Sequence, residues 1–209
     1  MTTISPEMAE AVGLLLGDGC VSRYLSRGRP YFEVAFNASP SEFGYYRTLV
    51  KPTLESELGV SGRLYLRSDN TTRYHIFGMK AACYFMEIGI PAGKKRDASI
   101  PKVIIGSGQA VPFIRGLYHA EGSLYRRYSK QYACHARLYS NLLMIQIRMK
   151  LGTLMAQLRH ELSSLGIATN TLGSKDGVFT LRITDQGEIA KFFKIVRPRY
   201  KTKVAPTIF

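Results

Sequence analysis

Cysteine is scarce in this sequence: there are three, an odd number at wide spacing, which gives no disulfide framework and no zinc-site pattern. Long apolar runs are missing too, and none approaches the roughly 18–20 residues that a transmembrane helix needs. The N-terminus lacks the basic region and apolar core of a secretion signal. These absences exclude a disulfide-stapled secreted domain and a membrane-spanning protein, and they predict an intracellular location.

Acidic side chains are also few. The chain has 29 Lys and Arg against 15 Asp and Glu, a net charge of +14. Such a surplus predicts a polyanionic partner, and nucleic acid is the commonest one. Residues 1–90 carry nine basic and nine acidic side chains, so the whole surplus lies in residues 91–209. A basic membrane-surface protein would need a basic amphipathic helix with a bulky apolar face, which is missing; a solvated basic surface without function is the other alternative.

One short pattern occurs twice. Residues 11–19 read AVGLLLGDG and residues 114–122 read IRGLYHAEG. Aligned without gaps, the copies share two glycines and a leucine, and each has an acid beside its last glycine. The two acids, Asp18 and Glu121, are 103 residues apart, about half the chain. The repeat predicts an internal duplication in which the acids are the important residues.

The order of expected elements repeats as well. Apolar periodicity and turn residues in the first half predict helices at 6–17, 41–58 and 79–88, with strand pairs in 20–37 and 59–78. Pro52 should kink or split the second of these helices. The second half predicts helices at 111–120, 151–164 and 186–196, with strands in 123–149 and a hairpin turning at 175–177. Each half is therefore expected to be αββαββα in an α+β protein, with halves at 1–90 and 111–209, a Gly-, Pro- and Lys-rich linker at 91–110, and a basic C-terminal tail.

Small residues line one face of each motif helix. Glycines four residues apart lie on the same face and let another helix approach closely. If the two motif helices pack side by side, their C-terminal acids meet, where mutual repulsion and the helix dipoles disfavour two carboxylates. A divalent cation relieves both, and backbone carbonyls at the helix ends can join it as oxygen ligands. The expected metal ligands are Asp18, Glu121, Gly17 and Ala120; the alternative is a pair of ordinary C-capping acids.

The two segments AVGLLLGDG and IRGLYHAEG resemble the paired motifs of single-chain LAGLIDADG homing endonucleases of the archaeal-intron type. The resemblance covers nearly the whole chain, because the order of elements also matches. It implies two pseudosymmetric halves joined at the motif helices, each with a four-stranded antiparallel saddle-shaped sheet over the DNA major groove. It also implies an intron-encoded monomer that cuts both strands of a long asymmetric DNA site with Mg²⁺, for which Mn²⁺ or Ca²⁺ can substitute structurally. Leu16 and His119 depart from the family pattern, and His119 is expected as an interface side chain.

Further site residues are expected around the acids and on the strands. The resemblance assigns peripheral catalytic roles to polar and basic residues, for which the best positions are Asn37, Lys150, Lys94 and Lys201. Arg63, Tyr65 and Arg67 alternate with apolar residues, so they share one face of a strand, with Arg73 and His75 opposite. The other expected DNA contacts are Arg23, Arg27, Arg29, Arg126, Arg127, Lys130, Arg137, Lys175 and Arg182.

Two alternatives to a nuclease stay open. An intron RNA maturase would keep the scaffold, the basic surface and even both acids, so cleavage of duplex DNA in Mg²⁺ is what distinguishes the two. A non-catalytic DNA-binding regulator on the same scaffold has no use for two acids that repel each other. An intein is not expected, because the sequence starts with Met and ends in Thr-Ile-Phe, without a splicing nucleophile or a terminal His-Asn.

Overall fold

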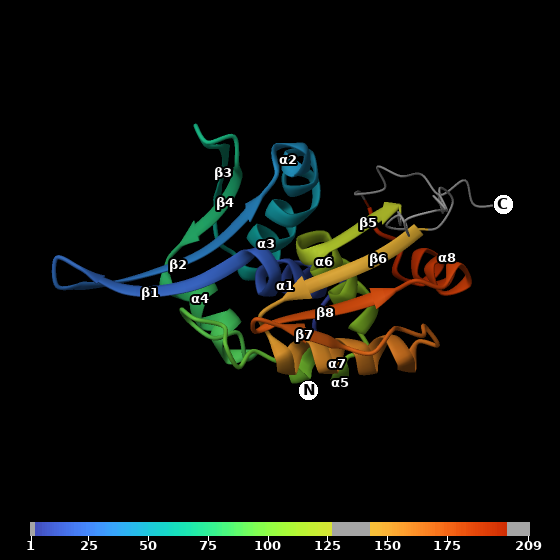
Figure 1. Ribbon diagram of the computed structural model, residues 1–209. Coiled ribbons are helices and arrows are strands. Elements are labelled where there is room, and N and C mark those ends of the chain that lie inside the picture. Colours follow the sequence, from blue (N-terminus) through green and yellow to red (C-terminus); the bar gives the residue numbers. More distant parts are fainter. Residues whose placement is uncertain (1–2, 127–142, 200–209) are drawn as a thin grey trace. The chain divides into compact units, whose positions relative to one another are not determined.

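In the computed structural model, which describes residues 3–126 and 143–199, the chain divides into two units, Met1–Ala120 and Glu121–Phe209. Each unit contains one four-stranded antiparallel sheet backed by helices (Figure 1). The strand orders are β1-β2-β4-β3 and β5-β6-β8-β7, which are the same order in the two copies. The α+β class and the repeated topology expected from the sequence are therefore confirmed.

The first unit begins with α1 (Pro6–Asp18), which starts where the sequence signals it. The Ser5 hydroxyl accepts a hydrogen bond from the Met8 amide at 3.0 Å, and Pro6 occupies the first turn, where no amide partner is needed. The sheet and the helix that closes this half follow the expected order, with bounds β1 (Gly19–Ser26), β2 (Arg29–Ala38), β3 (Arg63–Leu66), β4 (Thr72–Phe77) and α4 (Met79–Glu87).

The expected helix around Pro52 is divided into four helical pieces. They are η1 (Pro40–Glu42), α2 (Phe43–Tyr45), the π-helical turn η2 (Tyr46–Val50) and α3 (Lys51–Leu58). Pro52 lies in the first turn of α3, which continues directly from η2, and it has no amide to donate to the preceding turn. The π-helical turn before it absorbs the change in the hydrogen-bond pattern.

One face of the first sheet is buried and the other is open. Along β4, Thr72, Tyr74 and Ile76 are buried, and the residues between them are not. Val34 and Phe36 of β2 are buried as well, and α1 and α4 pack against the strands β1 and β2. The first sheet therefore has a helix-covered face and an open face. The hairpin of β1 and β2 extends beyond β4, which pairs only with the second half of β2 (Figure 1).

The segment expected as a linker, 91–110, is partly folded. It contains the short helix α5 (Lys102–Gly106), and Ala98, Ile100 and Ile104 in it are buried. Near its start, Ala92 forms a parallel bridge with Val21 of β1. This segment packs into the first unit because its apolar residues are spaced to bury themselves there.

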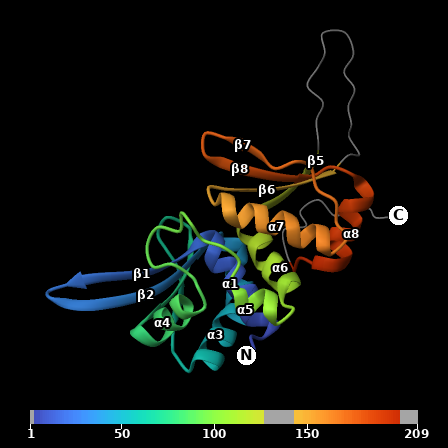
Figure 2. The same ribbon diagram turned by 90° about the horizontal axis from the view of Figure 1, so that it is seen from below.

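The second copy starts with α6 (Ala110–Glu121), most of which belongs to the first unit. The turn between its last two strands is Asp176-Gly177, and both residues have positive φ, at 52° and 71°, as a two-residue hairpin requires. The helices α7 and α8 contact the second sheet (Figure 2). The remaining bounds are β5 (Gly122–Arg126), β6 (Leu143–Met149), α7 (Gly152–Ser164), β7 (Gly173–Lys175), β8 (Val178–Ile183) and α8 (Gln186–Val196). Within residues 3–126 and 143–199, the helices are all too short or too polar to cross a bilayer.

Candidate functional site

The helices α1 and α6 cross at their matched glycines. A Cβ atom on Gly13 would overlap the carbonyl oxygen of Phe113 and lie 2.7 Å from the amide nitrogen of Leu117. A Cβ atom on Gly116 would overlap the carbonyl oxygen of Glu10 and lie 3.1 Å from the amide nitrogen of Leu14. These contacts are reciprocal under the 103-residue offset of the repeat. The two helix backbones therefore touch, which only glycine permits, and each acid lies five residues beyond its crossing glycine.

A buried polar cluster, which we call the Glu10 cluster, lies beside this crossing. Glu10 is fully buried, and its two carboxylate oxygens accept hydrogen bonds from the Tyr45 hydroxyl at 2.6 Å and from Arg115 at 3.0 Å. His119 is also fully buried, 3.7 Å from Glu10, with its ring edge-on to that of Tyr45 at 5.2 Å between centroids. The Glu10 cluster was not predicted, although a glutamate inside an apolar motif helix was a signal for it.

The C-terminal end of α1 presents an exposed carboxylate among hydrogen-bonding groups. Asp18 is exposed, and its backbone carbonyl accepts a hydrogen bond from the Asn37 side chain at 3.4 Å. Lys95 donates to the carbonyls of Leu16, Gly17 and Gly19 at 2.7–2.8 Å, and to that of Leu15 at 3.2 Å. The Lys95 ammonium thus lies at the C-terminal end of α1, where the helix dipole is negative. There it contacts Gly17, the neighbour of Asp18. Asn37, which the sequence predicts as a peripheral residue of the site, therefore lies next to Asp18.

The chain path explains why Lys95 and not Lys94 reaches this point. Gly93 donates its amide to the Val21 carbonyl at 2.8 Å, which holds the segment after α4 alongside β1. Gly93 has φ of 82°, so the chain turns there, and Lys95 points to the end of α1 while Lys94 is exposed. The repeat alignment favours Lys94 because it cannot resolve a one-residue offset in a loop.

Glu121 ends α6 as Asp18 ends α1. It is partly buried, and the first residue of β5 follows it directly, just as β1 follows α1. No group of three or more His, Cys, Asp or Glu side chains that could hold a metal ion occurs within the described ranges. Each helix end has one carboxylate and backbone carbonyl oxygens, which are ligands of the type that Mg²⁺ and Ca²⁺ prefer, and at the end of α1 the carbonyls of Leu16 and Gly17 already accept hydrogen bonds from Lys95. Mg²⁺ is commonly held by one or two carboxylates together with substrate phosphates, so the residues present fit this ion.

The open face of the first sheet carries the polar residues expected to share a strand face. Arg63 pairs in register with His75, and Tyr65 pairs with Arg73. The Arg63 guanidinium lies 5.2 Å from the centre of the Tyr65 ring, and the rings of Tyr65 and His75 are 5.4 Å apart. Burial, reinforced by the positive charges of Arg73 and Arg63 and opposed by Glu33, lowers the pKa of His75. The register confirms the expected grouping of these four residues.

Arg23 lies on the other face of the same sheet. It pairs in register with Phe32 and alternates in phase with the buried Val21, and its guanidinium lies 5.7 Å from the centre of the Phe32 ring. Arg23, which the sequence predicts as a DNA contact, therefore lies on the face opposite Arg63 and Arg73. Arg27 and Arg29 are exposed at the end of the β1–β2 hairpin, and Arg67 follows β3 and pairs with Asp69 at 3.2 Å.

The second sheet also separates its basic residues between two faces. Arg182 pairs in register with Gln146 and donates to its side chain at 3.2 Å, on the face opposite the buried Leu181 and Ile183. Alternation places Lys175 and Arg148 on this open face and Arg126 on the other one. Arg148 and Gln146 were not predicted as site residues, although both follow the alternation of β6. Lys150 is exposed just after β6, and Arg127, Lys130, Arg137 and Lys201 lie outside the described residues.

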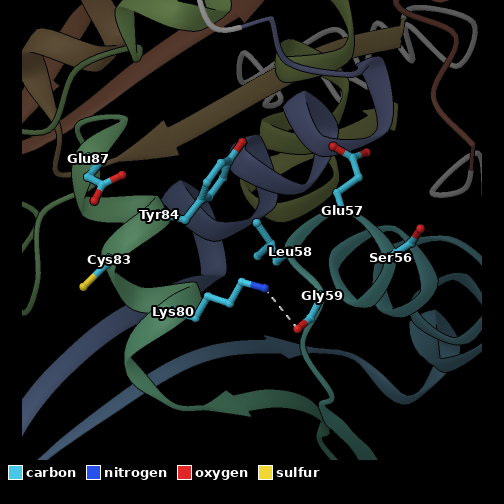
Figure 3. A pocket seen from close by; sticks show the side chains of 8 residues that line it. All are labelled: Ser56, Glu57, Leu58, Gly59, Lys80, Cys83, Tyr84 and Glu87. Atoms are coloured by element: carbon cyan, nitrogen blue, oxygen red, sulfur yellow. Dashed lines mark hydrogen bonds between the residues drawn. The ribbon is translucent and has the colours of Figure 1, made fainter.

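A pocket of about 560 Å³ opens between α3 and α4, on the helix side of the first sheet (Figure 3). Lys80 reaches across it and donates to the Gly59 carbonyl at 3.4 Å. The lining side chains include Glu57, Tyr84 and Glu87, which carry both charge and aromatic surface but no arrangement suited to phosphate chemistry. The pocket is separate from the end of α1, where the exposed acid, Asn37 and Lys95 converge.

No family sequence model and no curated protein sequence matches the chain. Solved structures do match. I-DmoI in complex with DNA and Mn has a TM-score of 0.64 at 20% identity, over 91% of this chain and 96% of that one. The LAGLIDADG meganuclease I-AabMI bound to uncleaved DNA has a TM-score of 0.61 at 15% identity, over 91% of this chain and 83% of that one.

A mutant of I-SmaMI is similar as well, with a TM-score of 0.64 at 11% identity, over 93% of this chain and 86% of that one. The chain has the fold of the LAGLIDADG homing endonucleases. At identities of 20% or less the likeness establishes the fold, and the assignment of an activity depends on this chain's own residues.

Proposed function

We propose that this protein is a site-specific endonuclease that hydrolyses both strands of a long, asymmetric duplex DNA target. The observation that carries the proposal is the reciprocal crossing of α1 and α6, with an acid five residues beyond each crossing glycine. An acid at each of two matched helix ends fits a nuclease, which needs one carboxylate for each strand that it cuts. The DNA complexes of I-DmoI and I-AabMI, which share the fold, support the same reading.

Asp18 and Glu121 would hold the divalent metal ion, with the backbone carbonyls of Gly17 and Ala120 as further ligands. When bound there, a divalent ion would polarise the scissile phosphate and lower the pKa of an attacking water. Mg²⁺ is the ion proposed, and structures of I-DmoI hold DNA together with Mn or Ca.

The neighbours of Asp18 would orient the reacting groups and balance charge. Lys95, fixed by carbonyls at the end of α1, places a positive charge where a phosphate would approach. Asn37, which donates to the Asp18 carbonyl, can order a water molecule from its remaining amide atoms. Lys150 and Lys201 are the corresponding proposals for the second half.

The open faces of the two sheets would lie on the DNA. A strand of eight residues, such as β1, spans about 27 Å at roughly 3.4 Å per residue, or about 8 base pairs. Two such sheets cover about 16 base pairs, which is rare enough in a genome for a site-specific enzyme. Two unlike halves in one chain, residues 1–90 and 111–209, would read an asymmetric site as a monomer. The proposal extends to an intron-encoded enzyme of the archaeal type that works inside the cell, where its DNA target lies.

Cleavage of a randomised duplex library tests this proposal. The purified protein is incubated with the library and Mg²⁺, and the new DNA ends are sequenced; a parallel reaction contains EDTA. We expect double-strand breaks within one non-palindromic consensus, and none in EDTA. Binding to intron RNA without any DNA cleavage would instead identify a maturase and overturn the proposal. Sequence-selective DNA binding without cleavage would identify a non-catalytic regulator and would overturn it as well.

A further inference from the structure

Glu33 is an acid in a place where an acid should be costly. It lies in the middle of β2, where it pairs in register with Ser22 of β1 and Phe77 of β4. Among the described strand residues of the open face, it is the one acidic side chain; the basic ones are Arg29, Arg63 and Arg73. A surface that must approach a polyanion gains nothing from a carboxylate unless that carboxylate has a particular task.

Basic groups hold the Glu33 carboxylate in one position. Arg73 donates to its Oε1 at 2.8 Å, and Nδ1 of His75 lies 3.5 Å from the same oxygen. The Glu33 side chain is only 13% exposed, so it is not a freely solvated charge. Arg73 pairs in register with Asn37, so its side chain must cross the small Ala35 to reach Glu33. Side chains of this length are seldom fixed by chance, because ordering each one costs conformational entropy.

The arrangement leaves hydrogen-bonding capacity on both partners. Within the described residues, Oε2 of Glu33 accepts no hydrogen bond, and the one acceptor of Arg73 is Oε1 of Glu33. The Nε atom of Arg73 is buried without a hydrogen-bond partner in that part of the chain, so any donor available to a ligand is on the terminal Nη1 or Nη2. The pair therefore presents guanidinium donors beside a carboxylate acceptor on the open face.

This order of donors and acceptors matches one base pair best. In the major groove a G·C pair presents two acceptors, N7 and O6 of guanine, followed by one donor, the N4 amino group of cytosine. An A·T pair presents an acceptor, a donor and another acceptor, followed by a methyl group, so a carboxylate next to the thymine edge is repelled. An arginine held against a glutamate is complementary to the first pattern and not to the second.

We propose that Glu33 is a specificity-determining residue that selects a G·C pair in the target, by accepting a hydrogen bond from the cytosine amino group while Arg73 donates to the guanine. This inference rests on the proposed function in one respect, which is that duplex DNA binds to the open face of the first sheet. The carboxylate contributes selectivity more than affinity, because the wrong base leaves it buried without a donor.

Selection of bound duplexes from a randomised library tests the proposal, with EDTA present so that no strand is cut. We expect the wild type to prefer a G·C pair at one position by roughly 5- to 100-fold. Glu33→Gln should weaken the preference for the G·C pair at that position without abolishing it as Arg73→Ala does, because Arg73 still donates to the guanine, and it should leave the other positions unchanged. Glu87→Gln, on α4, makes the same charge change on the helix side and should select the wild-type consensus.

A modified base then tests the contact atom. Pyrimidin-2-one lacks the N4 amino group of cytosine, so its substitution at the selected position should weaken wild-type binding. It should have little effect on the binding of Glu33→Gln, which no longer needs that amino group. Thermal melting of each variant confirms that it is folded.

Three outcomes overturn the inference. If Glu33→Gln binds every duplex more tightly and selects the same consensus, the carboxylate only repels DNA. If it relaxes the guanine preference as fully as Arg73→Ala does, Glu33 only orients the arginine. If the wild type selects no sequence, both this inference and the proposed function fail, whereas selective binding without cleavage removes only the proposed function.

Discussion

The motif helices α1 and α6 are alike where they touch and unlike beside it. At the crossing both have glycine, and each glycine meets the same two backbone groups of the other helix. Beside the crossing, Glu10 of α1 corresponds to Phe113 of α6, and Arg115 and His119 of α6 correspond to Val12 and Leu16 of α1. The matched glycines keep Asp18 and Glu121 at equivalent positions relative to the crossing. The unmatched residues beside the crossing make each helix the specific partner of the other.

The Glu10 cluster can form only between unlike helices. Two copies of α1 would bury two glutamates without an arginine, and two copies of α6 would bury two arginines without an acid. An unpaired buried charge costs several kcal/mol, so the cluster disfavours pairing between chains through identical helices. This is a physical reason for the two unlike motif helices of one chain to pair with each other rather than with the same helix of a second copy.

The largest expected effect comes from breaking this asymmetry. Glu10→Gln leaves Arg115 largely buried without its counter-ion, and we expect the free energy of unfolding to fall by about 3 kcal/mol. Glu7→Gln, in the first turn of the same helix, should change it by less than about 1 kcal/mol. Urea unfolding followed by circular dichroism measures both.

Replacing Glu10, Arg115 and His119 together sharpens the comparison between the two motif helices. The triple variant Glu10→Phe, Arg115→Val and His119→Leu gives each helix the residue of its matched position, so that no charge is buried. It should recover most of the stability that Glu10→Gln loses. A triple variant less stable than Glu10→Gln would show that the cluster stabilises the fold by more than charge pairing.

The next effect tests the likeness of the helices. Gly13→Ala adds a methyl group against the backbone of α6, which cannot move aside as a side chain can, and should cost about 3 kcal/mol. The control is Gly44→Ala in α2, where the new Cβ meets open space and a small gain is expected. Equal melting temperatures for Gly13→Ala and wild type would contradict the observed close approach.

A smaller effect is expected from two adjacent lysines of the segment after α4. Lys95→Met removes the ammonium from the carbonyls at the end of α1 and should cost about 1–2 kcal/mol of stability. It should also lower the rate of cleavage at least tenfold, because the positive charge beside Asp18 is lost. Lys94→Met, at an exposed position, should change the stability by less than about 0.5 kcal/mol. If the two variants behave alike in stability and cleavage, the position of Lys95 has no special role.

The smallest effect compares the two faces of the second sheet. Arg148→Ala, on the open face, should reduce the slope of log K against log salt by about 0.9, the contribution of one phosphate contact. Arg126→Ala, on the other face, should leave the slope unchanged. Salt titrations of duplex binding decide this, and a reversed order would mean that DNA approaches the helix-covered face.

Features that depend on neighbouring residues in the sequence were predictable. The cap of α1 at Ser5 and the hairpin turn at Asp176-Gly177 follow from residue types that prefer those backbone geometries. The register of Arg63 with His75 followed from alternation alone. The face of Arg23 was predictable from the same rule, since it is in phase with the buried Val21, but grouping by charge obscured it.

Features that depend on distant contacts were not predictable. Lys95 reaches the end of α1 because a loop turns at Gly93 and pairs with β1, and no local pattern encodes that path. The Glu10 cluster joins three helical segments and becomes visible only when they are packed. Asp18 and Glu121 could be predicted because they occupy matched positions in a motif that occurs twice. A single copy of the motif would not have distinguished either acid from an ordinary helix cap.

The most direct test of the central claim replaces one acid at a time. Asp18→Asn and Glu121→Gln are compared with wild type for duplex binding and for double-strand cleavage in Mg²⁺. Because each acid belongs to one of two matched helix ends, we expect either substitution alone to abolish double-strand cleavage, while the affinity for the target stays within about threefold of wild type. Double-strand cutting at the wild-type rate by either variant would contradict the account.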